Sequence, residues 1–380
     1  MNFQLNETQQ LIRETANKFA TERLAPSSIE RDEAELFPAD EVRELGDLGF
    51  MGMMVPERWG GAELDTISYV LAIEEISRVD ASVGVIMSVN NSLVCFGINR
   101  YGNDEQKERF LRDLATGKKL GAFALSEPEA GSDATNQRTT ATRDGNHYVL
   151  NGTKNWITNG STADVVLVMA SNDRSKGSKG ISTFIVEKGS PGFSVAKKEK
   201  KLGIRSSDTV SLSFSDCRVS EANRIGEEGT GFTFAMKTLE GGRIGIAAQA
   251  LGIAQGCLDA SIRYAKERKA FDKPIAELQA IQFKIAEMAT NVEAARYLLL
   301  QSALLKDAGK PFGREASMAK LFASKIAVQA ALEAIQIHGG YGYVREYLVE
   351  RYLRDAKITE IYEGTSEIQR LIIARSLLRS

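Results

Sequence analysis

The stretch IYEGTSEIQR occupies residues 361–370 and contains the carboxylate around which the rest of the chain is interpreted, Glu363. Gly364 gives the backbone conformational freedom directly after this carboxylate. Thr365 or Ser366 can cap a helix that begins there. The apolar side of that helix would comprise Ile368, Leu371, Ile372 and Leu378.

Two interpretations of Glu363 remain open from the residues alone. Unpaired backbone N–H groups at a helix start suit a site where negative charge develops on a bound carbonyl oxygen. An acidic residue before a helix more often only complements the helix dipole. Gln369 lies three residues after Ser366, so this pair also fits a capping box.

The composition is that of an ordinary globular chain, with 380 residues of which 43% are hydrophobic. This length allows two or three packed domains. The net charge of −2 and a pI near 6.0 argue against nucleic acid or an anionic membrane as a partner. The N-terminal residues do not resemble a secretory leader, and no run reaches the roughly 18 apolar residues of a membrane span. We therefore expect a cytoplasmic protein without membrane insertion.

Cysteine and histidine are too scarce to carry the chemistry. The cysteines Cys95, Cys217 and Cys257 are far apart, which indicates neither a disulfide framework nor a thiolate metal site. His147 and His338 are the only histidines, so a histidine triad or a histidine-rich metal site is close to excluded. We expect no metal, and acid–base chemistry falls to a carboxylate.

Hydrophobic periodicity divides the chain into three parts, which we place at 1–120, 121–230 and 231–380. The first and third parts show helical spacing, and the second shows short alternating or continuous apolar runs. Two long helices are expected at 281–308 and 314–337, and their short connection predicts an antiparallel pair. The pattern therefore predicts an α+β fold.

The central part contains recognisable turn and strand signals. Asp144-Gly145-Asn146 predicts a hairpin turn. The runs ADVVLVMAS, ISTFIVEKG and VSLSFSDCRV predict further strands. The charged run KKEKK at 197–201 is typical of a solvated edge that discourages strand pairing.

Three loops contain residues suited to a ligand. FALSEPEAGSD, residues 123–133, has small and hydroxyl residues that allow backbone N–H groups to approach a flat polar ligand or a phosphate. NWITNGS, 155–161, holds a tryptophan that can stack on an aromatic ring, although a core tryptophan is commoner. In ERKAFDKPIAELQ, 267–279, Arg268 suits a phosphate, although arginine is usually a surface residue. The chain has no GxGxxG and no Walker motif, so neither a nicotinamide Rossmann site nor a P-loop is indicated.

With these motifs the chain resembles the acyl-CoA dehydrogenases, and in particular their short-chain, butyryl-CoA branch. The likeness extends over nearly the whole sequence and follows the order of the family's motifs. They are SEPEAGSD at 126–133, KNWITNG at 154–160, KLGIRSSDT at 201–209, LEGGRIGIAAQALGIAQ at 239–255, RKAF at 268–271, QIHGGYGY at 336–343 and RDAKITEIYEGTSEIQR at 354–370.

The resemblance implies an N-terminal α-helical domain, a middle antiparallel β domain and a C-terminal four-helix bundle. It also implies FAD as cofactor, an acyl-CoA substrate, an electron-transferring flavoprotein as partner, and a homotetramer built as a dimer of dimers. The implied FAD contacts are Phe123, Ala124, Leu125, Ser126, Gly131, Ser132, Trp156, Ile157, Thr158, Thr365 and Glu367, with Arg268, Phe271, Gln279, Gln336, Gly339 and Gly340 serving the flavin of a neighbouring subunit. The implied substrate contacts are Ser132, Glu240, Gly241, Gly242, Arg243, Tyr362 and Gly364.

By the same resemblance Glu363 is the catalytic base of α,β-dehydrogenation to trans-2-enoyl-CoA. Dry surroundings would raise the pKa of this carboxylate and make it a better base. Three positions depart from the family pattern: Glu240 replaces a more usual aspartate, Asp272 a usual glycine, and His338 an apolar residue. The alternatives are a medium- or branched-chain substrate, an acyl-CoA oxidase that uses oxygen, or a related protein that binds flavin, nucleic acid or a partner without turnover.

Overall fold

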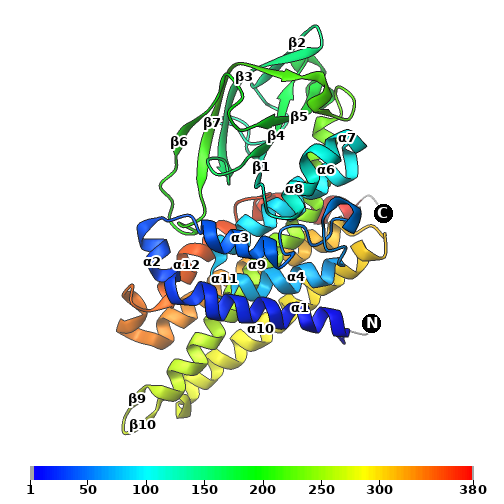
Figure 1. Cartoon of the computed structure of the whole chain (residues 1–380). Helices are drawn as coiled ribbons and strands as arrows, with labels where there is room; N and C mark the ends of the chain where they lie inside the picture. Colours follow the sequence, from blue (N-terminus) through cyan, green and yellow to red (C-terminus); the bar gives the residue numbers. More distant parts are fainter. Residues whose placement is uncertain (1–3, 379–380) are drawn as a thin grey trace.

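The structure is a computed structural model and describes residues 4–378. A β domain lies at one end of the molecule, and two groups of helices pack side by side beneath it (Figure 1). The N-terminal group contains α1 (Glu7–Phe19), α2 (Ser28–Ala34), α3 (Ala39–Asp47), α4 (Thr66–Ser77), α5 (Ala81–Ser88), α6 (Phe96–Tyr101), α7 (Asp104–Gln106) and α8 (Arg112–Ala115).

The segment from Ala81 to Tyr101 is one continuous helical run, in which the π-helix η4 (Val89–Cys95) joins α5 to α6. Among residues 4–378 it is the one helix whose length and mean hydropathy would suit a membrane span, although polar residues such as Asn90 and Asn91 interrupt it. It is nevertheless a core helix, because 94% of its apolar window is buried inside the protein. Asn90 donates to the carbonyl oxygens of Met51 and Leu114 and accepts from the N–H of Gly121. This asparagine thus joins the helices to the first strand.

The middle part forms a sheet of eight strands within the described residues, in the order β6-β7-β3-β2-β4-β5-β8, with β1 beside β4. Most neighbours are antiparallel, but β1 pairs with β4 in parallel, so the sheet is mixed. Asp144 pairs with His147 across the predicted hairpin. The strands are β1 (Gly121–Ala124), β2 (Thr140–Asp144), β3 (His147–Thr158), β4 (Val165–Ser171), β5 (Ile181–Glu187), β6 (Phe193–Lys198), β7 (Thr209–Ser220) and β8 (Arg224–Ile225). The exposed strand β6 at one edge carries the start of the charged run.

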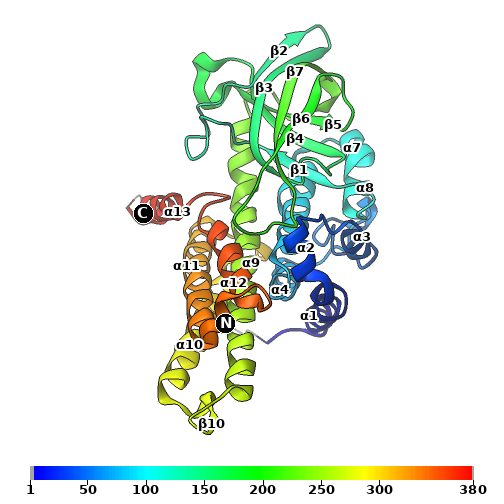
Figure 2. The same ribbon diagram turned by 90° about the vertical axis from the view of Figure 1, so that its left-hand side faces the viewer.

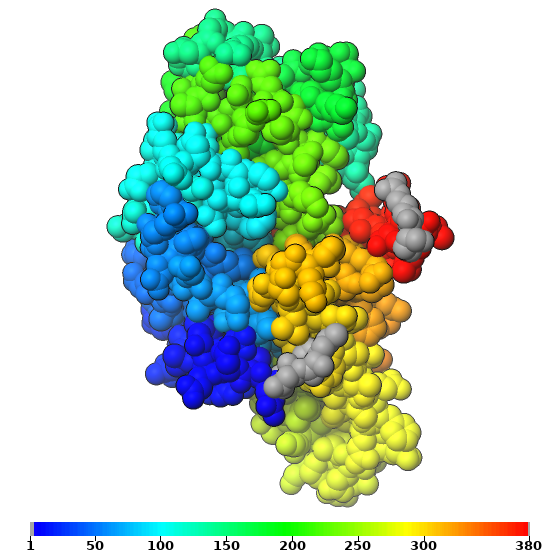
Figure 3. All heavy atoms as spheres, turned by 90° about the vertical axis from the view of Figure 1, so that its right-hand side faces the viewer, coloured from blue at the N-terminus to red at the C-terminus, as the bar shows by residue number. Residues whose placement is uncertain are grey.

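The C-terminal part consists of α9 (Gly231–Glu267), β9 (Lys269–Ala270), β10 (Lys273–Pro274), α10 (Gln279–Asp307), α11 (Gly313–His338), α12 (Leu348–Thr359) and α13 (Ser366–Leu378). The helices α9, α10 and α11 pack together, and α12 lies against α9 and α11. The expected antiparallel pair is α10 and α11, whose connection turns at Gly309 with a φ of 65° (Figure 2). The predicted α+β fold with its helical bundle is confirmed. In Figure 3, α13 stands out from the body of the molecule.

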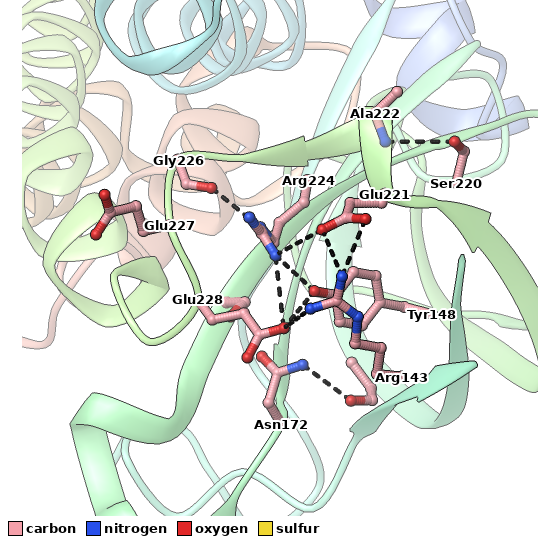
Figure 4. Close-up of polar contacts among 12 residues, drawn as sticks. Arg143, Tyr148, Asn172, Ser220, Glu221, Ala222, Arg224, Gly226, Glu227 and Glu228 are labelled. Atoms are coloured by element: carbon pink, nitrogen blue, oxygen red, sulfur yellow. Dashed lines mark hydrogen bonds and ion pairs between the residues drawn. The ribbon is translucent and has the colours of Figure 1, made fainter. Parts of the chain in front are cut away.

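A polar network fixes the β domain on the segment that leads into α9 (Figure 4). Arg143 of β2 forms an ion pair with Glu221 at 3.0 Å. The hydroxyl of Tyr148 donates to Glu228 and accepts from Arg224. Since Glu228 lies just before α9, these contacts join the β2–β3 hairpin to the start of that helix.

Candidate active site

The loop between α12 and α13 carries Glu363 in a left-handed backbone conformation. Glu363 has a φ of 52° and Gly364 a φ of 97°. A left-handed conformation is unfavourable for a residue with a β-carbon, whereas glycine adopts it readily. Gly364 therefore supplies the freedom that the sequence predicted, and Glu363 itself is held in a conformation that needs support from its surroundings.

The carboxylate of Glu363 points toward the N-terminal half of α9. Its Oε2 atom is buried and has no hydrogen-bond partner within the described residues. A β-carbon built on Gly242 of α9 would lie 2.1 Å from this oxygen and 2.8 Å from Cδ2 of Leu93 in η4. The glycine at 242 therefore makes the space that the carboxylate occupies. An unpartnered buried oxygen in such a position is available to a ligand.

Burial raises the pKa of Glu363 to about 7, and two cations oppose this effect, Lys320 more strongly than Arg243. Arg243 is itself buried, its Nε has no partner in the described part of the chain, and burial lowers its pKa. A carboxylate with a pKa near neutrality is well matched to accept a proton at physiological pH.

The start of α13 differs in one respect from the sequence expectation. The Thr365 hydroxyl accepts from the N–H of Ile368 at 3.4 Å, so Thr365 is the capping residue. The predicted capping box between Ser366 and Gln369 is absent, because the Gln369 amide donates to the Gly364 carbonyl at 2.8 Å. The N–H of Ser366 donates to the carbonyl of Glu360 at 2.9 Å. The N–H groups of Ser366 and Ile368 at the start of α13 are therefore already hydrogen-bonded within the chain.

The backbone N–H of Glu363 remains free of protein acceptors among residues 4–378. It lies on the residue whose carboxylate is buried and unpartnered. The N–H donor and the carboxylate of this one residue can thus contact two neighbouring atoms of the same ligand group, a carbonyl oxygen and a carbon that loses a proton.

Part of the predicted substrate set gathers around this carboxylate. Gly242 and Arg243 face Glu363, and the hydroxyl of Tyr362 donates to Gln249 of α9. Gly241 faces the Nζ of Lys306, which lies 3.9 Å from a β-carbon built there. Glu240 binds Lys237 at 3.2 Å on the same helix, and Ser132 lies on an exposed loop of the β domain.

The first group of predicted flavin contacts lies along β1 and the end of β3. The N–H of Asn155 donates to the carbonyl of Ser126, which brings the stretches 123–126 and 155–158 together. The β3–β7 register shifts between Lys154 and Ile157. This irregularity gives Trp156 a φ of 59° and leaves it 57% exposed, so the commoner expectation of a core tryptophan was wrong. Phe123, Ala124, Leu125 and Ile157 are buried, Ser126, Thr158 and Thr365 are half-buried, and Gly131 and Glu367 are exposed.

Sequence reasoning missed the buried ion pair that supports this region. Lys154 binds Glu127 at 2.7 Å and donates to the carbonyl of Leu125 at 3.0 Å. Glu127 in turn accepts from the N–H groups of Arg138 and Thr139. Both residues lie inside the motifs noted above, but no periodicity or spacing distinguishes them from surface charges.

The second group of predicted flavin contacts lies at the opposite end of the molecule, around the β9–β10 tip (Figures 1 and 2). Arg268, Gly339 and Gly340 line a cavity of about 460 Å³, and His338 lines it as well. Phe271 at the tip is 85% exposed. Gln279 and Gln336 are also exposed. A single chain therefore does not bring the two groups together.

The residues in both groups are suited to FAD. Near β3, an exposed aromatic ring lies two residues before the hydroxyl of Thr158, which suits a flat ring with a polar edge. At the tip, β-carbons built on Gly339 and Gly340 would meet nothing within 4 Å, and Arg268 is close by, which suits a pyrophosphate. A larger hollow of about 830 Å³ between α1, α4 and α10 contains none of the predicted residues, and its charges, such as Glu74 and Arg296, pair with one another.

Comparison with known protein families matches the whole length of this architecture. The model of "Acyl-CoA dehydrogenase, N-terminal domain" matches residues 6–118, that of the middle domain 122–217 and that of the C-terminal domain 229–378. The chain therefore belongs to the acyl-CoA dehydrogenase family, which is a family of flavin-dependent oxidoreductases that act on acyl-CoA.

Individual relatives agree with this assignment. The chain is 53% identical over 377 residues to the mitochondrial short-chain specific acyl-CoA dehydrogenase of Rattus norvegicus, covering 99% of this chain and 92% of the relative. The structure of butyryl-CoA dehydrogenase from Megasphaera elsdenii has a TM-score of 0.98 at 47% identity and covers 100% of both chains. A chain from work on the electron transferring flavoprotein of Acidaminococcus fermentans has a TM-score of 0.99 at 50% identity, again with 100% coverage of both.

Proposed function

We propose that this protein catalyses the FAD-dependent α,β-dehydrogenation of short-chain acyl-CoA thioesters to trans-2-enoyl-CoA and passes the electrons to an electron-transferring flavoprotein. The observation that carries this proposal is the buried, unpartnered carboxylate oxygen of Glu363 against Gly242. The full-length similarity to enzymes named for short-chain substrates supports the substrate class. The relative from work on an electron transferring flavoprotein supports the partner.

Glu363 acts as the base. Its carboxylate takes the proton from the α carbon of the thioester, while its own backbone N–H donates to the thioester carbonyl oxygen, where negative charge develops. FAD bound there would supply the acceptor for the hydride that leaves the β carbon. The thioester thus loses a proton from the α carbon and a hydride from the β carbon, and the electron pair left from the α C–H bond forms the new double bond. Arg243 favours the ionised form of the carboxylate before proton transfer.

Packing next to the base supports the preference for a short acyl chain. The Tyr69 hydroxyl and Ser88 Oγ lie 2.9 Å apart in the buried region close to Glu363. A β-carbon on Gly245 would approach these two atoms to 2.5 and 2.4 Å. We therefore propose that Ser132, Glu240, Gly241, Gly242, Arg243, Tyr362 and Gly364 bind the substrate and that the packed tyrosine and serine limit its length.

We further propose that FAD is bound by Phe123 to Ser126, Gly131, Ser132, Trp156 to Thr158, Thr365 and Glu367 of one subunit and by Arg268, Phe271, Gln279, Gln336, Gly339 and Gly340 of another. The separation of these two groups within one chain supports a homotetramer built as a dimer of dimers. Exposed apolar residues on α13, among them Leu371 and Leu377, are also suited to an interface between subunits. The domains at 1–120, 121–230 and 231–380, and a cytoplasmic location, stay predictions.

The substitution Glu363→Gln tests the function directly, because it keeps size and hydrogen bonding but removes basicity. The variant is expected to bind FAD and butyryl-CoA while losing anaerobic flavin reduction by several orders of magnitude in rapid mixing. The matched variant Glu240→Gln removes the neighbouring carboxylate on α9 and is expected to change mainly apparent affinity. Near-normal flavin reduction in Glu363→Gln, or its collapse only in Glu240→Gln, would contradict the proposal.

A further inference from the structure

The turn that carries Glu363 is held by a buried lysine from another helix. Lys320 lies in the interior of α11 and is only 1% exposed. Its Nζ donates to the carbonyl oxygen of Gly364 at 2.5 Å. This contact joins residues 44 positions apart in the sequence, and one of them directly follows the base.

The carbonyl of Gly364 receives a second donor. The side-chain amide of the buried residue Gln369 donates to the same oxygen at 2.8 Å. Glu363 and Gly364 both have a positive φ, which is unfavourable for a residue with a β-carbon, so contacts around Glu363 must stabilise this conformation. Two donors on one carbonyl fix the orientation of the peptide unit and, with it, the direction of the preceding side chain.

The helix α11 is attached to this loop at a second point. The hydroxyl of Ser324, four residues after Lys320, donates to the carbonyl of Thr359 at 2.8 Å. Thr359 is the last residue of α12. One face of α11 thus contacts both ends of the segment 359–364. Of the two side chains that make these contacts, only Lys320 is charged.

The charge of Lys320 has no conventional partner. Within residues 4–378 no carboxylate lies within the 4.0 Å of an ion pair with its Nζ. A buried ammonium without such a partner is costly. Burial lowers the pKa of Lys320 to about 7, Glu363 and Glu360 oppose this effect, and the neighbouring cation Arg243 adds to it. Glu363 faces Lys320 and Arg243, and its charge raises the pKa values of Tyr69 and Tyr362 as a lesser effect beside their burial.

We propose that Lys320 is the positioning residue of the catalytic base: it fixes the Glu363–Gly364 turn through the Gly364 carbonyl and stabilises the ionised form of the carboxylate that takes the α proton. This inference rests on the proposed function of Glu363. Of the two cations that act on the base, Lys320 has the larger effect and also contacts the backbone beside it. In this role Lys320 acts through the Gly364 carbonyl and the carboxylate of Glu363.

Two substitutions separate the hydrogen bond from the charge. Lys320→Met removes both, whereas Lys320→Gln retains an N–H donor and removes only the charge. Ser324→Ala is the matched control, because it deletes the other contact between α11 and the same loop without changing a charge. Flavin reduction by butyryl-CoA is measured anaerobically from pH 5.5 to 9 in the FAD-loaded proteins, together with flavin content and unfolding temperature.

We expect Lys320→Met to reduce the maximal rate of flavin reduction by about ten- to a hundredfold with little change in the apparent dissociation constant of butyryl-CoA. In both lysine variants the acid limb of the pH profile moves upward by about one pH unit, because an opposite charge near the carboxylate has been lost. Lys320→Gln loses less rate than Lys320→Met at the upper plateau. Ser324→Ala keeps the wild-type pH profile.

The outcomes distinguish this inference from the proposed function. If wild-type flavin is not reduced by butyryl-CoA, the proposed function is wrong and the inference falls with it. If the wild type is reduced and both lysine variants keep its pH profile, only the role of Lys320 is wrong. Loss of flavin binding and of the fold in both lysine variants but not in Ser324→Ala would also overturn the inference, because Lys320 would then serve the fold rather than the base.

Discussion

A β-carbon on Gly242 would lie 2.1 Å from Oε2 of Glu363, although the two residues are 121 positions apart. Atoms without a bond between them cannot come so close, so either the carboxylate or the helix would have to move. The glycine on α9 and the carboxylate of Glu363, the proposed base, therefore depend on each other.

The substitution Gly242→Ala tests this dependence. We expect it to displace the carboxylate and to lower the rate of flavin reduction by about a hundredfold, because misplacement of a reacting group by about 1 Å has a cost of that size. Flavin content is expected to stay unchanged. Gly241→Ala is the comparison, since a β-carbon there would meet only the Nζ of Lys306 at 3.9 Å, and its effect on the rate should be smaller. Equal effects of the two substitutions would show that the close approach at 242 has no functional role.

The raised pKa of Glu363 predicts that Glu363→Gln stabilises the FAD-loaded protein at alkaline pH. Below about pH 4.5 the carboxyl group is protonated in the folded and unfolded states alike, and as the pH rises from there to about 7 only the unfolded state ionises readily. The wild type therefore loses stability over this window, and above it the loss is complete. Each unit of difference in pKa corresponds to about 1.4 kcal/mol, so the gain in the variant should approach roughly 3 kcal/mol at pH 8.

Unfolding by urea at pH 5.5 and pH 8 measures this gain. The stability difference between Glu363→Gln and the wild type should be larger at pH 8. The exposed Glu30→Gln is the control for the loss of a carboxylate as such. A difference that shrinks as the pH rises would mean that the carboxylate is not destabilised by burial.

Arg268→Ala is expected to lower the FAD content while leaving the fold intact. Arg268 is exposed at the tip of the bundle, where its guanidinium lies 5.5 Å from the centre of the Tyr341 ring and lines the cavity with Gly339 and Gly340. Its loss removes a charge suited to a pyrophosphate but no buried packing. Absorbance after dialysis gives the ratio of flavin to protein, and Lys266→Ala, in the last turn of α9 just before Arg268, serves as control. Unaltered FAD affinity in Arg268→Ala would refute its assignment.

Lys154→Met is expected to destabilise the protein by about 3 kcal/mol, because it leaves the buried carboxylate of Glu127 without its cation. Arg143→Ala breaks an ion pair of the surface network in Figure 4 and should cost roughly 1 kcal/mol or less. Urea unfolding of the two variants measures the contrast. The prediction fails if the two substitutions have the same effect on the free energy of unfolding.

The sequence by itself determined the local elements and the family. Turn residues at 144–146 and the apolar runs after them placed the strands, and the long periodic segments placed α10 and α11 within two residues of their observed ends. These features depend on neighbours in the chain, and local propensity and periodicity express them directly. The motif around Glu363 could be recognised from the sequence because its residues are also neighbours in the chain.

Only the tertiary structure decided which distant residues meet at the carboxylate of Glu363. Gly242, Arg243 and Lys320 come to Glu363 from two other helices, and no spacing in the sequence connects them. The prediction of a capping box at Ser366 was wrong because the side-chain amide of Gln369 donates to the Gly364 carbonyl instead. Trp156 is exposed because a local shift in strand register turns it outward. Contacts of this kind depend on how whole elements pack, and the loss of water around Glu363, which sets its pKa, exists only after that packing is complete.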